Sequence, residues 1–525
     1  MEKQEKKTQY LFGGLFLVFF ICISLLNIRY MGKYLTSDMY GDLWVSKLMW
    51  EQKTLFPENW VFGNQLYVLA TPNLAALFYG LTNNMLIAMG LASTIMVAIF
   101  VVAYYWMLKT TFSFTQIIIG LVILFASICT THIGYNQYAQ LYFVGCTYYI
   151  CYLITLLINI GVFIRFYSNQ KVNIFVYIVS LITSFAMGIQ SIRQTLIMVM
   201  PFIFVEICLI VYSKVKKNKQ NIKLIVFIAV TSLFNICGVI LSKKIDVKRD
   251  AIVGSMEFSP FSNITGKLIG TIKHIISIIG FDDFVAYIRR GNGSFIPSLL
   301  TVVCALILFL VFIYSIVLLF KKKDFENNTT LIIFILFVSC LAVFGSFFVF
   351  EMTRLSKYYF VYYLLVPIVI SSQYKNSKNI VKNALIIQIV LVLAVSYIAP
   401  IAKMELKPSV FEEIADYCEK NGYEIVYSEW DNAGNVAGAS DCRIVAGRWD
   451  ASDIFTIKAH TNVMDVYSEA DNEKAVYLFT DESLEQAEMY IEQNEPDISF
   501  ERLSTFYDEE GNAKYLYKSD KQLMK

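Results

Sequence analysis

Two aspartates, Asp38 and Asp42, lie four residues apart in the segment YLTSDMYGDLWVSKLMWEQKTLFPENW, which directly follows a long apolar run. A carboxylate beside a bound hydroxyl group can take its proton as the hydroxyl attacks, which is general base catalysis. The pair therefore predicts a general base for a polar acceptor. A helix is expected from Gly41 to Thr54, and Asp is favoured as a helix cap, so a capping role for Asp42 stays open. For Asp38 we favour the catalytic interpretation.

Basic residues occur in two short polar segments between later apolar runs. Arg193 lies in GIQSIRQTL, whereas Arg354 and Lys357 lie in FEMTRLSKYY. A guanidinium group binds phosphate oxygens through two parallel hydrogen bonds, so we expect these residues to hold a phosphate group. The alternative is that such arginines reach toward lipid headgroups. Candidates for supporting roles in the same kind of segment are Glu351, His132 and Tyr135.

The composition is that of an integral membrane protein. Hydrophobic residues make up 57% of the chain and charged residues 16%, whereas soluble domains carry about 25% charged residues. The net charge of +2 provides no strong field for binding nucleic acid. Because a span needs about 20 apolar residues, the sequence predicts about 11 transmembrane helices. The runs are 9–29, 84–108, 114–131, 138–165, 174–191, 195–213, 223–242, 298–320, 330–350, 358–374 and 384–402.

The short loops divide by charge into two sets. Lys and Arg gather in alternate loops, and this side is predicted to be cytoplasmic. The other side then receives a first outer loop at 31–83, a long loop at 243–297, and the tail from 403. The first outer loop contains the run 65–81, which is short and interrupted by proline, so we interpret it as a re-entrant or interfacial helix. The helix before it is expected to lie in the interface, with Leu43, Trp44 and Leu48 toward lipid.

The tail differs from the rest of the chain. Residues 403–525 are expected to form a small soluble α/β domain outside the membrane, after a transmembrane domain at 1–402. An amphipathic helix around Ile414, strands at EIVYS and AVYLFT, and a helix at DESLEQAEMYIEQ support this. Cys418 and Cys442 are the only cysteines outside the predicted membrane part, and a disulfide between them is one option.

An acidic pair after the first span, an interfacial helix and short outer loops with arginines resemble the GT-C superfamily of membrane glycosyltransferases. The segment LFPENWVFGNQLYVLATPNLAALFYGLTNN also resembles multi-spanning proteins of Gram-positive anaerobes. The resemblance covers about the first 400 residues in topology. It implies a mainly α, polytopic fold and catalysis by an aspartate in the first outer loop. Asp38 matches that position and Asp42 could equally hold it, because the DE dipeptide of some members is absent there.

The resemblance also implies substrates. Transfer would take a hexosyl or pentosyl group from a polyprenyl-phosphate sugar to an envelope glycan, at the outer face of the cytoplasmic membrane. Several families of this fold need a divalent metal, but two aspartates are too few oxygen ligands to argue for one. The segment EWDNAGNVAGASDCRIVAG resembles the outer domain of similar bacterial proteins. Trp430 and Asp431 in it could contact an acceptor sugar, although we prefer core packing for Trp430.

Three other functions compete with transfer. A coupled transporter keeps ionisable residues near mid-membrane, whereas the predicted spans contain few, with Glu206 as the clear exception. A flippase or polymerase of lipid-linked glycans would use outer arginines but needs no aspartate after the first span. A non-catalytic envelope scaffold with the same fold is the third. The substitution Asp38→Asn separates these functions, because only a transferase should fail.

Overall fold

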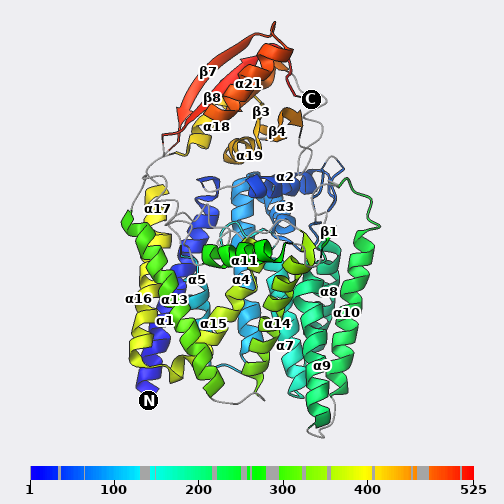
Figure 1. The fold of residues 1–525 in the computed structure, drawn as a ribbon, viewed down its shortest axis with the longest axis vertical. Coiled ribbons are helices and arrows are strands. Elements are labelled where there is room, and N and C mark those ends of the chain that lie inside the picture. The colour runs from blue at the N-terminus through cyan, green and yellow to red at the C-terminus, as the bar shows by residue number, and fades with distance from the viewer. Residues whose placement is uncertain are drawn as a thin grey trace.

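The computed structural model of the 525-residue chain shows a helical bundle with a sheet domain at one end (Figure 1). The residues that the structure describes are 2–33, 37–58, 60–63, 65–129, 142–147, 149–215, 221–249, 257–259, 263–278, 295–321, 327–351, 356–404, 408–450, 453–457, 472–508 and 511–524.

Long apolar helices form the bundle. The described helices are α1 (Glu2–Ile28), α4 (Met85–Leu108), α5 (Phe114–Phe125), α7 (Tyr149–Tyr167), α8 (Ile174–Gln190), α9 (Met200–Val215), α10 (Ile222–Ser242), α13 (Phe295–Lys321), α14 (Asn328–Val349), α15 (Tyr362–Gln373), α16 (Asn379–Val392) and α17 (Ala399–Met404). A π-helical segment, Thr195–Val199, leads into α9, and another, Leu393–Ile398, joins α16 to α17. Eight of the described helical segments are long and apolar enough to cross a membrane, and α5 and α8 are shorter apolar helices. Each predicted run therefore contains a helix, while the count of eleven spans stays a prediction.

Glycines let neighbouring helices approach closely. A Cβ atom on Gly90 of α4 would collide with the backbone of Asn27 on α1. On α8, Gly188 packs in the same way against the backbone of Asn235 on α10. A Cβ atom on Gly238 of α10 would likewise collide with the backbone of Phe185 on α8. Small residues at helix contacts are typical of membrane proteins, because apolar side chains gain little by leaving lipid and close van der Waals packing must hold the helices together.

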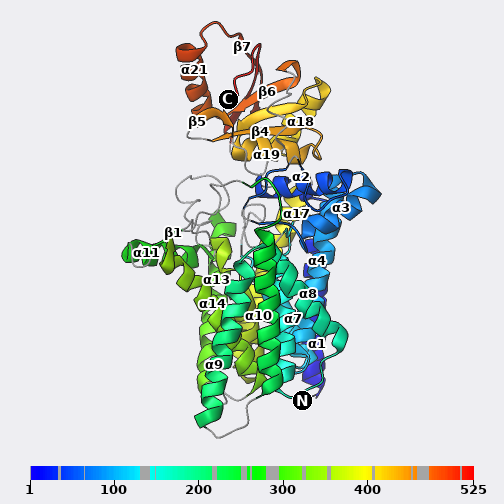
Figure 2. The same ribbon diagram turned by 90° about the vertical axis from the view of Figure 1, so that its right-hand side faces the viewer.

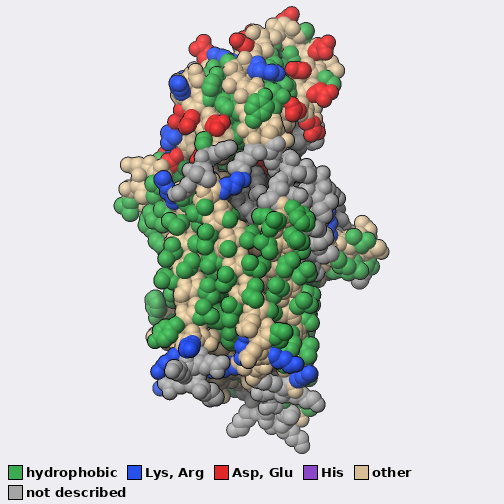
Figure 3. Space-filling model, turned by 90° about the vertical axis from the view of Figure 1, so that its left-hand side faces the viewer, with side chains coloured by type: hydrophobic (Ala, Val, Ile, Leu, Met, Phe, Trp, Pro, Cys, Tyr) green, Lys and Arg blue, Asp and Glu red, His purple; other side chains and the backbone are tan. Residues whose placement is uncertain are grey.

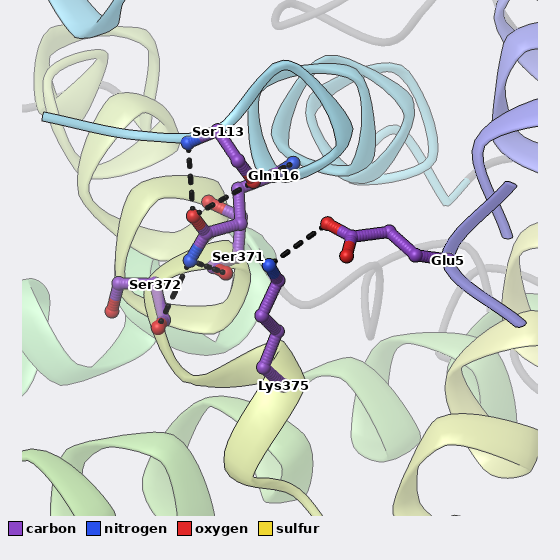
Figure 4. Close-up of polar contacts among 6 residues, drawn as sticks. All are labelled: Glu5, Ser113, Gln116, Ser371, Ser372 and Lys375. Atoms are coloured by element: carbon purple, nitrogen blue, oxygen red, sulfur yellow. Dashed lines mark hydrogen bonds and ion pairs between the residues drawn. The ribbon is translucent and has the colours of Figure 1, made fainter. Parts of the chain in front are cut away.

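One end of the bundle, which we call the basic end, carries the N-terminus (Figure 1). Lys and Arg side chains gather there on the face drawn in Figure 3. There Gln116 of α5 donates through Nε2 to the backbone carbonyls of Ser371 and Ser372 in α15, at 3.4 Å each. Lys375 pairs with Glu5 of α1 at 2.8 Å (Figure 4). Above this end the face drawn in Figure 3 is an apolar belt, as expected of a surface that meets lipid.

Three helices lie across the opposite end, which we call the site end (Figures 1 and 2). They are α2 (Ser37–Glu51), α3 (Thr71–Thr82) and α11 (Ile264–Ile278). Both helices of the first outer loop were predicted, but the lipid contacts of α2 were not correct. Leu43, Trp44 and Leu48 are buried by protein, because neighbouring elements cover the helix.

The domain beyond the site end is built on one mixed sheet. Its elements are α18 (Val410–Lys420), β3 (Ile425–Glu429), α19 (Trp430–Ala439), β4 (Val445–Asp450), β5 (Asp453–Ile457), β6 (Ala475–Phe479), α21 (Asp481–Asn494), β7 (Phe500–Tyr507) and β8 (Ala513–Ser519). The strand order is β5-β4-β3-β6-β8-β7, with β3 parallel to β4 and β6. The predicted helices and strands of the tail are confirmed. Cys418 and Cys442 are both free and buried, so the disulfide option is wrong.

Candidate functional site

Helix α2 presents two different faces. Tyr40, Trp44 and Lys47 share one face by their spacing of three and four residues, and positions 38, 42 and 49 share the opposite one. Asp42 is 1% exposed. The sulfur of Met49, on the same face as Asp42, accepts a hydrogen bond from Asn73 of α3 at 3.7 Å. Position 42 is therefore directed toward α3 and the bundle.

The structure changes the assignment of the helix cap. Helix α2 begins at Ser37, four residues before the predicted start at Gly41, so Asp42 lies inside the helix and cannot be its N-cap. Asp38 now lies in the first helical turn, where a carboxylate is also favoured by the helix dipole. The structure describes the backbone of Asp38 but not its side chain. The non-catalytic explanation, in which the carboxylate stabilises the N-terminus of the helix, therefore applies to Asp38 rather than to Asp42.

Arg193 is fixed at the site end of the bundle. It precedes the π-helical segment Thr195–Val199, a geometry often found at functional sites. Its Nη1 donates to Gln65 Oε1 at 3.0 Å. Its guanidinium lies 5.2 Å from the ring of Tyr149 and 5.5 Å from that of Tyr358. The side chain is partly exposed, so Arg193 keeps surface available for a ligand.

A chain of contacts connects α2 with the surroundings of Arg193. The methyl group of Met39 in α2 occupies the space that a Cβ atom on Gly145 would take, and Gly145 needs a positive φ of 58°. Two residues later, the carbonyl of Thr147 accepts a hydrogen bond from Thr71 Oγ1 at 2.6 Å. The irregular segment 65–70 before Thr71 then reaches α8, where the carbonyl of Gln190 accepts a hydrogen bond from the amide of Leu66 at 3.1 Å.

The other predicted outer loops join the same end. The amide of Phe62 donates to the carbonyl of Lys248 at 2.9 Å, which joins the first outer loop to the long loop. Strand β1 (Glu257–Phe258) pairs with β2 (Phe350–Glu351). Lys267 of α11 donates to the carbonyls of Ser259 and Phe348 at 2.9 and 3.3 Å. The segment that precedes the predicted phosphate-binding loop is therefore held by the long loop.

Several predicted site residues cannot be evaluated by side-chain geometry. Glu351 lies in β2 and Lys357 in a 3₁₀ turn, Ser356–Tyr359, but only their backbones are described. Arg354, His132 and Tyr135 lie outside the described residues. Tyr358, which follows Lys357, contacts Arg193 as described above, so the Arg193 segment and the 356–359 turn do meet.

The sheet domain is attached directly to helix α2. Lys47 Nζ donates to the carbonyl of Cys442 at 3.1 Å, and the hydroxyl of Tyr40 accepts from the amide of Ala446 at 3.2 Å. Asp441 Oδ1 accepts from the amide of Leu86, at the start of α4, at 2.7 Å. Burial raises the pKa of the Asp441 carboxyl group, although the hydrogen bond from Leu86 and the charge of Arg443 oppose the shift.

Arg448 was missed by the sequence analysis. It is 0% exposed, and its guanidinium lies 4.3 Å from the ring of Tyr40 on α2 and 4.3 Å from the ring of Trp430 on α19. Trp430 is half-buried, whereas Asp431 is exposed in the first turn of α19. In the sequence, Arg448 is one charge among many in a polar tail, and no local pattern indicates its partner on α2.

A metal site is not supported by the residues at hand. Of the predicted acidic site residues whose side chains the structure describes, Asp42 is buried and Asp431 is exposed. Among the described residues, no three His, Cys, Asp or Glu side chains gather as a metal site requires. We therefore derive no step through a metal.

Comparisons with known proteins agree with the fold. No protein-family model matches the sequence, and no curated protein matches it. The structure is similar to the crystal structure of ArnT from Cupriavidus metallidurans in the apo state, with a TM-score of 0.51 and 9% identity over 97% of both chains. The structure of the same protein bound to undecaprenyl phosphate aligns with a TM-score of 0.48 and 10% identity, again over 97% of both chains. The chain thus shares its overall fold with this ArnT structure.

Proposed function

We propose that the chain is a membrane glycosyltransferase that moves a sugar from a polyprenyl-phosphate donor to a cell-envelope glycan. One observation carries the proposal: the bundle end of a GT-C fold holds a buried carboxyl group, Asp42, on a fixed helix. Arg193, a partly exposed cation held by Gln65 and two tyrosine rings, lies at the same end. A carboxylate and a phosphate-binding cation are the two groups that this transfer requires.

The proposed reaction is a single displacement. The acceptor hydroxyl attacks the anomeric carbon of the donor sugar, and the bond from this carbon to the phosphate oxygen breaks with its electron pair left on the phosphate. A carboxylate, Asp38 or Asp42, takes the hydroxyl proton. Arg193 stabilises the charge of the departing phosphate, together with Arg354 and Lys357 by prediction. Attack from the face opposite the phosphate inverts the configuration at the anomeric carbon.

The proposal also implies an orientation of the protein in the membrane. Lys and Arg side chains gather at the basic end, as Figure 3 shows for one face, and such a bias favours the cytoplasmic side. The site end and the sheet domain would then lie outside the cytoplasm. A donor with a polyprenyl chain would reach Arg193 from the membrane plane, because its tail stays in lipid while its phosphate group lies at the surface.

Glycan mass spectrometry tests the proposal. A deletion strain is complemented with the wild type, Asp38→Asn, Asp42→Asn or the control Glu51→Gln, an exposed carboxyl group on the same helix. We expect the wild type and the control to restore one envelope sugar, and at least one Asn variant to fail at an equal level in the membrane. If both Asn variants restore the sugar, the transferase proposal is wrong. A flippase, a polymerase or a scaffold would then be the better interpretation.

A further inference from the structure

Tyr40 occupies a special place on α2, because it stands two residues from Asp38 and two residues from Asp42. Its ring is contacted on a face by the guanidinium of Arg448 at 4.3 Å. Its hydroxyl accepts a hydrogen bond from the amide of Ala446 at 3.2 Å. Both partners belong to strand β4, so one strand holds the tyrosine at two points. Fixing both the ring face and the hydroxyl limits rotation of α2 about its own axis.

Arg448 completes this attachment from the domain side. Its other 4.3 Å neighbour is the ring of Trp430, on the helix that follows β3. A planar guanidinium between two rings gives both of them a fixed orientation, and such contacts are stronger when water is excluded. Arg448 is 0% exposed, and both of its ring contacts are made within the protein, one to α2 and one to α19. Its contacts therefore act between parts of the protein.

A second group of contacts holds the position of α2 along its axis. Two turns after Tyr40, Lys47 donates to the carbonyl of Cys442 at 3.1 Å. The adjacent Asp441 accepts from the amide of Leu86 on α4 at 2.7 Å. The loop before β4 thus binds both α2 and the start of a bundle helix. Rotation and translation of α2 are both restricted by residues 441–448.

We propose that Arg448 is a positioning residue for α2, and that the C-terminal domain thereby sets the orientation of the α2 face that carries positions 38 and 42. The role of the two aspartates rests on the proposed function, whereas the positioning of α2 does not. A misplaced base loses rate without losing substrate affinity, because the donor phosphate is held elsewhere, at Arg193.

Hydrogen exchange of the purified full chain tests the positioning. We expect Arg448→Met, which keeps an apolar side chain of similar length, to speed exchange of the α2 amides about tenfold or more. The matched control is Arg502→Met. Arg502 lies 4.8 and 5.5 Å from the rings of Tyr515 and Tyr517, but within the sheet domain. The control should leave α2 unchanged. Unchanged α2 exchange in Arg448→Met would overturn the proposal.

A second variant distinguishes a loss of positioning from a general folding defect. Trp430→Leu removes the other ring and keeps Arg448, so it should speed α2 exchange less than Arg448→Met does. If Arg448→Met loosens the whole sheet domain equally with α2, then Trp430→Leu decides. Faster exchange limited to α2 supports the proposal, and exchange limited to the sheet domain contradicts it.

Transfer kinetics then separate positioning from a purely structural role. With a radiolabelled polyprenyl-phosphate sugar added to membranes, Arg448→Met should lower kcat about tenfold and leave the KM for this donor within about twofold. Arg448→Lys keeps the cation and should recover part of kcat. A raised KM with normal kcat would contradict positioning. If Asp38→Asn and Asp42→Asn both keep full activity while Arg448→Met still loosens α2, the proposed function fails and the attachment of α2 stands.

Discussion

Arg193 and Arg448 are both placed between two aromatic rings, but their surroundings differ. Arg193 lies 5.2 and 5.5 Å from its rings, bonds Gln65 and is partly exposed. Arg448 lies 4.3 Å from each of its rings and is 0% exposed. The rings hold both guanidinium groups, so exposure is what separates their roles. The partly exposed Arg193 is the one that we propose binds a ligand, and the covered Arg448 is the one that we propose orders its protein neighbours.

The largest effect is expected at the exposed member of the pair. Arg193→Gln should lower transfer about 100-fold, because a charge-assisted bond to the departing phosphate is lost. The free energy of unfolding should change by less than about 1 kcal/mol, since the side chain is partly exposed. Transfer in membranes and thermal unfolding measure the two quantities. Arg249→Gln, at an exposed arginine of the same end, is the control and should keep full activity. A stable protein with full transfer after Arg193→Gln would break the comparison.

For the covered Arg448, a substitution should have its clear effect on stability, whereas for Arg193 the effect on stability should be small. Arg448→Met should lower the free energy of unfolding by about 2 kcal/mol, because two desolvated contacts to aromatic rings are lost. Arg502→Met should lower it much less, since exposed contacts of this kind are weaker. Denaturant unfolding in detergent measures both. Equal losses in the two variants would show that burial does not distinguish these arginines.

A smaller effect is expected at Asp441, which holds the same interface through a hydrogen bond. Asp441→Ala should lower the free energy of unfolding by about 1 kcal/mol by leaving the amide of Leu86 without its acceptor. Asp441→Asn keeps an acceptor and should lose much less. Asn also tolerates the positive φ of 57° at this position.

The same residue predicts a pH dependence. Burial raises the pKa of Asp441 above its ordinary value of 3.8, so the folded state binds the proton more tightly than the unfolded state. Its contribution to stability is therefore fully present below pH 3.8 and is lost as the pH rises through the higher folded-state pKa. Asp441→Asn should remove this slope. Identical pH profiles of unfolding for the variant and the wild type would contradict the assignment.

The smallest effect is expected at the basic end. Lys375→Ala removes an exposed ion pair with Glu5 that has a nitrogen–oxygen distance of 2.8 Å. The free energy of unfolding should fall by less than about 0.5 kcal/mol, because water and salt screen such a pair. Thermal unfolding at low and high salt measures the change. A loss as large as that of Arg448→Met would show that a cation needs neither burial nor aromatic rings to stabilise this fold.

The spans could be predicted because each is a continuous apolar run. Helix α10, for example, reads IKLIVFIAVTSLFNICGVILS, and hydropathy alone identifies it. Helix α11 was not predicted within the long loop. Its apolar residues Ile264, Leu268 and Ile272 form only one exposed face, and the helix is short. An amphipathic helix of this length gives a weak signal against the polar residues around it.

Candidate site residues could be selected only where a charge contrasts with its neighbours. Arg193 stands out in the sequence because it lies between two apolar runs, and its phosphate-binding role stays a prediction. Helix α2 begins four residues before the predicted start at Gly41. Glycine is a poor helix former, yet this glycine is buried inside the helix. Packing of the bundle and the sheet domain on both sides outweighs that local preference. Arg448 could not be found, because its significance depends on Tyr40, which is distant in sequence.

The contacts of α2 with the sheet domain also set an order of events during biosynthesis. Lys47 and Cys442 are 395 positions apart, and Tyr40 and Ala446 are 406 positions apart. Helix α2 is therefore synthesised early, whereas its partners in the sheet domain are synthesised only after most of the chain. A chain that stops before residue 441 would keep the predicted spans and the contact of α2 with α3, but it would lack the contacts of α2 with the sheet domain. Under the proposed function, such a nascent or truncated chain would transfer sugar more slowly than the full chain, until synthesis has passed β4.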